Sequence, residues 1–292
     1  MPDSQTRPFS IKIFLPAGDP DGLRLIERSL WTGVGVVFNR SDYKTVAGRP
    51  EFQRTGVYVL IGPSEDSSLP TIYVGEGDPV KPRLDSHHSN KDFWTWAIFF
   101  TTKDNSLNKA HVQFLESRLH HLAKEAKQSR LDNLQSPTPP TLTEAEQADM
   151  EGFLLDMLPI FPLVGLSVLE TPEPRTAERT LLYIEAKGIK AAGYEDSKGF
   201  VVKSGSQMFG DERNSCPDAI KSLRQDLVGQ GIVEPQGGYF IFKADYAFNS
   251  PSNAAGVILG GSANGRVEWK TRDGRTLKAI QEAGVECDSI DG

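Results

Sequence analysis

Apolar and polar residues alternate at the start of the chain. Residues 9–15 read Phe-Ser-Ile-Lys-Ile-Phe-Leu, a pattern typical of a half-buried strand. A turn-rich break over 16–21 follows, and the apolar residues between Leu23 and Leu30 then have helical spacing. Val34 to Phe38 indicates a second strand. We therefore expect a strand–helix–strand extension over residues 1–53.

The pattern over residues 54–135 predicts one α/β unit in the order strand, strand, helix, strand, helix. The strands are expected at 56–61, 71–74 and 94–100, where apolar and aromatic residues gather. Pro82 suits the first position of a helix, and Ser106 is expected to cap a long amphipathic helix with an apolar stripe from Ala110 to Leu122.

The remainder of the chain predicts a linker and a second module, which makes the protein α+β. Residues 136–178 begin with a proline-rich stretch, continue with an expected helix over 143–161, and end in a second linker. Residues 179–292 form the expected C-terminal accessory domain. Its predicted strands lie at 181–186, 199–203 and 239–243, its helices at 217–228 and from Ser250, and Asn264-Gly265 is expected to turn into a hairpin through Trp269.

Composition narrows the class of protein. No apolar run approaches the roughly 20 residues of a membrane span, and the polar start of the sequence has no signal core, so we expect a cytoplasmic protein without membrane contact. Cys216 and Cys287 lie far apart and are expected to be reduced thiols. The net charge of −7 argues against a protein that coats nucleic acid nonspecifically.

The residues that suggest chemistry lie in the 54–135 unit. Two expected strands carry Gly56-Val57-Tyr58 and Tyr73-Val74-Gly75, and both phenols can point to one face of a hairpin. Arg83 and His87 are four residues apart on one helix face, Glu116 lies beside an apolar stripe, and Asn133 ends the unit. Burying such a polar set is costly unless its members satisfy one another or a ligand.

These residues, in this order, resemble the signature of the GIY-YIG nucleases, with Val57 and Val74 where isoleucine is usual. The resemblance implies a small three-stranded antiparallel sheet flanked by helices, and a metal-dependent endonuclease acting on DNA. It assigns Tyr58 as general base, Tyr73 to position the phosphate or water, and Arg83 to neutralise the phosphate. His87 would orient a phenol or share the base role. Glu116 would hold Mg²⁺ or Mn²⁺, and Asn133 would support the site.

Each of these residues also has a structural interpretation. The tyrosines could be core residues with hydrogen-bonded hydroxyls, and Arg83 with His87 could form a solvated helix face. Glu116 could be an exposed helix residue and Asn133 a helix terminator. His88, His111, His120 and His121 are interpreted as surface or packing residues rather than as a metal cluster.

The C-terminal run from Ser250 to Trp269 is similar to an uncharacterised domain found behind GIY-YIG nucleases, and to modules associated with restriction enzymes and adenine methylases. This implies an accessory role in recognising DNA. Lys243, Arg266, Lys270 and Arg272 give the segment a basic tilt and are the candidate DNA-binding residues, with a solvated surface as the alternative.

The leading hypothesis is thus an endonuclease in restriction, defence or mobile-element biology, with DNA as partner and a homodimer as one route to double-strand cleavage. A catalytically silent DNA-binding or regulatory protein is the alternative, motivated by the acidic charge. A protein-interaction scaffold is a third hypothesis, motivated by the same charge and the long amphipathic helices.

Overall fold

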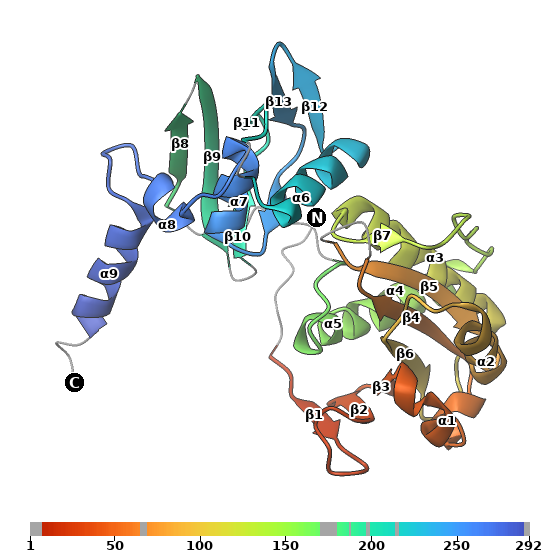
Figure 1. Ribbon diagram of the computed structural model, residues 1–292. Helices are drawn as coiled ribbons and strands as arrows, with labels where there is room; N and C mark the ends of the chain where they lie inside the picture. The colour runs from red at the N-terminus through yellow and green to blue at the C-terminus, as the bar shows by residue number, and fades with distance from the viewer. Residues whose placement is uncertain are drawn as a thin grey trace. The chain divides into compact units, whose positions relative to one another are not determined.

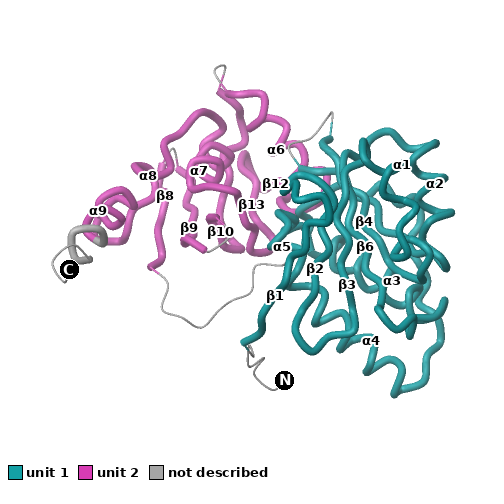
Figure 2. The backbone as a smooth tube through the Cα atoms, turned by 90° about the horizontal axis from the view of Figure 1, so that it is seen from below, with its two compact units in different colours: residues 1–65, 69–170 teal, residues 66–68, 171–292 magenta. Residues whose placement is uncertain are grey.

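The computed structural model describes residues 8–64, 69–169, 180–186, 188–196, 199–213 and 216–288, with side chains as far as residue 283. The chain divides into two compact units, residues 1–65 with 69–170 and residues 66–68 with 171–292 (Figure 2). None of the helices in the described ranges has the length and apolarity that a membrane span needs. Each unit is described by itself below.

The first unit is built on one mixed sheet of seven strands in the order β1-β2-β3-β6-β4-β5-β7 (Figure 1). The strands are β1 (Ile11–Phe14), β2 (Arg24–Arg28), β3 (Gly33–Asn39), β4 (Gly56–Gly62), β5 (Thr71–Gly77), β6 (Trp96–Thr102) and β7 (Arg130–Leu131). The helices are α1 (Tyr43–Val46), α2 (Lys81–Asn90), α3 (Lys109–Ala126), α4 (Glu144–Met157) and α5 (Ile160–Leu163), with short 3-10 turns η1 (Arg40–Asp42) and η2 (Pro50–Gln53).

Helices cover both faces of this sheet, which explains why β4 is apolar and buried along its whole length. On one face Val57 and Val59 of β4 pack with Leu115 of α3 and Leu154 of α4. On the other face Tyr58 and Leu60 pack with Leu84 of α2. The expected order of two strands, helix, strand and helix is confirmed in β4, β5, α2, β6 and α3.

The sheet is larger than the expected three strands. The three expected strands lie next to one another in the sheet, in the order β6-β4-β5. Strand β3 pairs with β6 along its full length, and β2 and β1 extend the sheet further on that side. The three strands described within the expected 1–53 extension therefore belong to the same sheet. They do so because Val36 and Val37 bring two apolar faces that only a covered sheet can bury.

Some expected element types and bounds are wrong. Leu23 to Leu30 forms strand β2 rather than a helix, because it pairs with strands on both sides and buries Leu25 and Ile26. Asn108, not Ser106, caps α3, and its side chain accepts a hydrogen bond from the His111 backbone. The expected helix over 143–161 breaks at Pro159 into α4 and α5.

The second unit contains a four-stranded sheet in the order β14-β10-β9-β8 and a three-stranded sheet in the order β11-β13-β12. The strands are β8 (Leu182–Ala186), β9 (Ile189–Asp196), β10 (Gly199–Val202), β11 (Gln207–Phe209), β12 (Val233–Gln236), β13 (Tyr239–Phe242) and β14 (Tyr246–Phe248). The helices are α6 (Asp218–Gly229), α7 (Pro251–Leu259), α8 (Gly265–Glu268) and α9 (Leu277–Asp288). The expected strands at β8, β10 and β13 and the helices at α6 and α7 are confirmed.

The expected hairpin through Trp269 is wrong. Asn264 instead caps α8, its side chain accepting a hydrogen bond from the Arg266 backbone at 3.2 Å. Gly265 serves close packing, since a Cβ there would lie 2.1 Å from the Pro251 carbonyl carbon. After α8, Lys270 forms isolated antiparallel β-bridges with Tyr183 and with Thr276.

Candidate active site

A buried tyrosine–histidine pair forms the floor of the candidate site. The Tyr58 hydroxyl on β4 lies 2.8 Å from Nε2 of His87 on α2, and both side chains are buried. Burial, followed by the nearby cations Arg83 and Lys91, lowers the pKa of His87 to about 4. His87 is therefore neutral at pH 7, so its Nε2 can accept the phenolic proton of Tyr58 in a hydrogen bond.

The glycine of the second strand makes room for this phenol. Tyr58 and Gly75 are directly paired between β4 and β5, so both face the α2 side of the sheet. A Cβ at Gly75 would lie 2.4 Å from the Tyr58 hydroxyl oxygen, well inside contact distance. The Gly75 of the sequence motif thus has a steric reason: the phenol lies where a side chain would be.

Tyr73 lies at the half-open rim of the same cluster. Its ring centroid is 4.8 Å from that of His87 and 6.3 Å from that of Tyr58. The ammonium of Lys91 lies 4.6 Å from the Tyr73 ring centroid and pairs with Asp132. The two phenols therefore share one face, as the sequence indicates, with a cation that the sequence analysis did not single out.

Arg83 joins the buried phenol to solvent. Its guanidinium, on the exposed side of α2, hydrogen-bonds the Tyr58 hydroxyl. Burial raises the pKa of Tyr58 above its usual value, the neighbouring Tyr73 adds to this, and the Arg83 charge opposes it. The phenol is therefore protonated at neutral pH in the protein by itself.

Glu116 approaches from the other face of the sheet, on α3. Its carboxyl is half-buried, and burial followed by the charge of Glu76 raises its pKa to about 7, against the opposing charges of Arg83 and Lys109. The Glu76 carboxylate, on β5, accepts a hydrogen bond from the Lys109 ammonium at 2.7 Å. The second carboxylate was missed because the strand was expected to end at Val74, two residues before it.

Asn133 acts on the backbone rather than on the phenols. Its side-chain amide accepts a hydrogen bond from the Val74 N–H at 3.0 Å and donates one to the Val74 carbonyl at 2.8 Å. It thereby continues, by one residue, the pairing that β7 makes with β5. Asn133 holds the strand between Tyr73 and Gly75 and is a positioning residue.

The described residues contain no group of three or more His, Cys, Asp or Glu arranged to hold a metal ion. The residues present fit a simpler cation site. Mg²⁺ is commonly bound through one or two carboxylates with water completing its shell. Glu116 and Glu76 would supply those carboxylates, since the charge of Glu76, after burial, contributes to the raised pKa of Glu116. The other histidines have separate surroundings. His88 stacks on Tyr43 with ring centroids 5.1 Å apart, and His120 is buried. His111 takes part in the capping box of α3, and His121 is exposed and pairs with Glu125.

The four candidate DNA-binding cations of the second unit differ in their surroundings. Lys243 pairs with Glu234 at 3.2 Å, and Arg266 bonds Gln281 at 2.8 Å and lies 3.8 Å from Glu282. Lys270 and Arg272 instead line one hollow beside Tyr183. The structure therefore separates two cations with local acidic partners from two that face open space.

Comparison with known proteins gives one family match. The profile of a domain of unknown function, DUF4357, matches residues 182–281, which agrees with the similarity of this region to an uncharacterised domain. No match to the GIY-YIG family was found for the first unit. No curated protein and no solved structure matches the chain.

Proposed function

We propose that this protein is a metal-dependent endonuclease that hydrolyses phosphodiester bonds of DNA, with its catalytic site in the first unit. The observation that supports the proposal is the convergence of Tyr58, Tyr73, Arg83 and His87 with the half-buried carboxylate of Glu116. Polar groups gathered at a cost in burial, several with shifted pKa values, are characteristic of functional sites.

The roles follow from the chemistry of each group. Arg83 is exposed and can form two hydrogen bonds to a phosphate in a planar fork. Glu116, with Glu76 beside it, would hold Mg²⁺ or Mn²⁺, which supplies charge neutralisation at the phosphate when bound. Tyr73 lies at the rim, where its hydroxyl can orient the phosphate or the attacking water.

Tyr58 and His87 form a path for a proton. The Tyr58 oxygen can accept a proton from water as its own proton passes along the 2.8 Å hydrogen bond to neutral His87. Because burial raises the pKa of Tyr58, the phenol stays protonated until further positive charge comes close and lowers that pKa. In this proposal, a metal ion that arrives with the DNA supplies that charge and activates the Tyr58 phenol.

The test is a cleavage assay of plasmid, linear, single-stranded, branched and modified DNA with Mg²⁺ or Mn²⁺. We expect cutting by the native protein and a loss of at least about 100-fold in Glu116→Ala, because removal of an electrostatic catalytic group typically costs that much. Glu125→Ala is the matched control, since Glu125 is exposed on the same helix and pairs only locally with His121 at 3.2 Å. Equal cutting by Glu116→Ala would disprove the assignment.

A catalytically silent DNA-binding protein is the second candidate. It is favoured by the protonated state of Tyr58 and by the lack, among the described residues, of a ready cluster of three metal ligands. Under this alternative, DNA binds without being cut in any metal, and Glu116→Ala leaves binding unchanged.

A further inference from the structure

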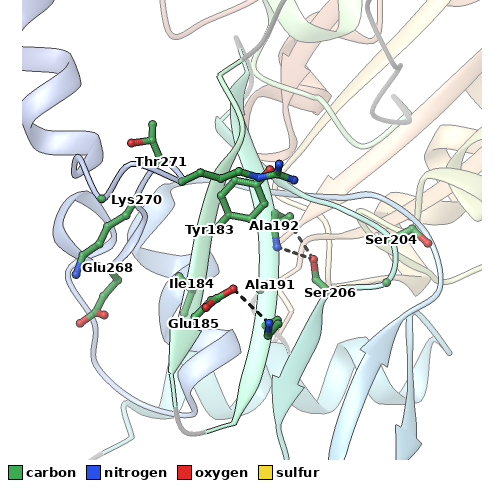
Figure 3. A pocket seen from close by; sticks show the side chains of 14 residues that line it. Tyr183, Ile184, Glu185, Ala191, Ala192, Ser204, Ser206, Glu268, Lys270 and Thr271 are labelled. Atoms are coloured by element: carbon green, nitrogen blue, oxygen red, sulfur yellow. Dashed lines mark hydrogen bonds and ion pairs between the residues drawn. The ribbon is translucent and has the colours of Figure 1, made fainter.

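A hollow of about 750 Å³ lies on the second unit, beside the edge strand β8 (Figure 3). Its lining comes from β8, from β9, from the segment Ser204–Ser206 and from the turn that follows α8. The volume is within the roughly 300–1,000 Å³ of small-molecule sites in proteins. The hollow lies inside the region matched by the domain of unknown function.

An aromatic ring with a small neighbour opens the hollow. Tyr183 exchanges backbone hydrogen bonds with Lys270 at 2.7 and 3.0 Å on one side and is paired with Ala192 of β9 on the other. Directly paired residues project to the same face of a sheet. Figure 3 shows the Tyr183 ring beside Ala192 at the hollow.

Two cations at this place are uncompensated. Within the described ranges, neither Lys270 nor Arg272 forms an ion pair with a carboxylate, and Asp273, next in the chain, bonds Arg275 instead at 2.9 Å. The Arg272 guanidinium lies 5.3 Å from the Tyr183 ring centroid. An arginine stacked on an aromatic ring keeps its edge N–H groups free to bind an anion.

The turn that carries these cations is held in place. The Thr271 N–H bonds the Arg275 carbonyl at 2.9 Å, and the Arg275 N–H bonds the Thr271 hydroxyl at 3.1 Å. Before the turn, buried Trp269 stacks on Phe200 at 4.3 Å and donates its indole N–H to the Pro251 carbonyl at 3.0 Å. A fixed turn loses little conformational entropy when a ligand binds.

Two carboxylates limit what the ligand can be. Glu185 and Glu268 also line the hollow, and among the described residues Glu185 forms an ion pair with Lys190 alone, at 3.6 Å. A continuous run of phosphates would meet these charges and be repelled. A ligand with one phosphate near Arg272 and an amino-bearing ring near Glu268 would pair with both the cation and the carboxylate. Carboxylates accept hydrogen bonds from the exocyclic amino groups of bases.

We propose that this hollow binds one nucleotide of a single-stranded nucleic acid, with the base against Tyr183 and its phosphate on Arg272 and Lys270. Unpaired bases stack on aromatic side chains in this way, whereas bases in a duplex do not expose their faces. The proposal concerns the second unit alone and stands or falls independently of cleavage by the first.

The test measures, by fluorescence anisotropy, the binding of labelled ten-nucleotide oligomers to the full chain. EDTA is present so that no metal-dependent cutting can occur. We expect dC and dA oligomers to bind more tightly than a duplex of the same length. Tyr183→Leu should weaken binding about five- to 150-fold, the range found for removing one base-stacking aromatic, while Tyr183→Phe should retain it. One neutralised phosphate predicts a slope of log K against log salt of about −0.7.

Matched controls come from the paired cations. Arg272→Gln and Lys270→Gln should each weaken binding several-fold, whereas Lys243→Gln and Arg266→Gln should not, because acidic neighbours already neutralise the latter two. Three outcomes would overturn the proposal: equal effects of all four substitutions, duplex binding that Tyr183→Leu weakens as much as it weakens oligomer binding, or unchanged oligomer binding by a correctly folded Tyr183→Leu protein. Binding of dCMP alone as tightly as the oligomer, or of polyglutamate in its place, would overturn the assignment to a nucleic-acid strand.

Discussion

Around the Tyr58 phenol, burial and neighbouring charge act in opposite directions. Burial raises the pKa of the phenol and lowers that of His87 to about 4, while Arg83 pulls the phenol toward ionisation. The result is a neutral hydrogen-bonded pair beneath an exposed cation. A neutral pair costs less to bury than an ionised one, and it can still transfer a proton when charge arrives.

In the nuclease proposal, Glu116 sets the pH dependence of metal binding. Since its pKa is raised to about 7, a proton competes with the cation below that pH. We expect the dissociation constant for Mn²⁺ to rise up to tenfold for each pH unit below about 7 and to level off above it. Titration of the full chain by calorimetry between pH 5 and 8.5 measures this, with Glu116→Gln as the variant that should lose the dependence. A flat profile in the native protein would contradict it.

Gly75→Ala tests the steric origin of the motif glycine. The added methyl would lie 2.4 Å from the Tyr58 hydroxyl oxygen, so the phenol must leave its 2.8 Å hydrogen bond to His87. We expect nuclease activity to fall by at least about tenfold, with a pKa of His87 shifted in NMR titration. Gly48→Ala is the control, because nothing lies within 4 Å of a Cβ there. An unshifted His87 resonance in Gly75→Ala would show that the packing argument is wrong.

At the scale of elements, the site depends on how β5 is fastened along both edges. β4 pairs with it over its whole length, from Gly56↔Gly77 to Gly62↔Thr71, whereas β7 pairs with only Thr71 and Ile72. The Asn133 amide takes over where β7 ends. The strand that carries Tyr73 and Gly75 is thus held by a side chain at the point nearest the phenols.

Asn133→Ala should loosen that edge. The change leaves the N–H and C=O of Val74 without their partner, which typically costs about 1–3 kcal/mol when such groups are not rehydrated. Urea unfolding of the native protein and the variant measures the difference. Asn90→Ala serves as the control, since Asn90 is exposed and makes only a weak 3.3 Å side-chain contact with Ser86. Equal stability of all three proteins would mean that Asn133 does not fasten β5.

At the scale of the whole molecule, each unit has its own interior. The two apolar clusters on the faces of the seven-stranded sheet draw only on residues between Ile11 and Leu169, including Leu166 and Val168 after α5. Phe200 and Trp269 lie in the interior of the second unit. A unit with its own core can fold by itself. A net charge of −7 for the whole chain is also compatible with a local group of cations at the hollow.

Fragments 1–169 and 180–292 should therefore each fold cooperatively. Calorimetry should give a single two-state transition for each, because each fragment corresponds closely to one compact unit with its own buried apolar residues. In the nuclease proposal, only the first fragment should retain Glu116-dependent cutting. A fragment without a cooperative transition would show that its core needs the other unit.

The secondary structure near the site was largely predictable from sequence. β4, β5 and α2 are short, strongly patterned and bounded by turn residues, so local periodicity was enough to predict them, and with them the shared face of Tyr58 and Tyr73. The strand at Arg24–Arg28 was not predictable, because the apolar residues at positions 23, 25, 26 and 30 also fit one face of a helix. Only the pairing with strands on both sides decides for a strand.

The sequence alone was enough to predict most strands and helices around the candidate site and a separate module after residue 178, because periodicity and turn residues are local properties. It did not predict that the strands before residue 54 and the helices α4 and α5 belong to the same unit as β4, β5 and β6. Only the tertiary structure decided the partners of the candidate residues. Glu76 joins Glu116, Asn133 binds the Val74 backbone, and Lys270 with Arg272 face a hollow while Lys243 and Arg266 have acidic neighbours. These contacts join residues far apart in the chain, and their strength depends on burial and distance, which no local pattern encodes.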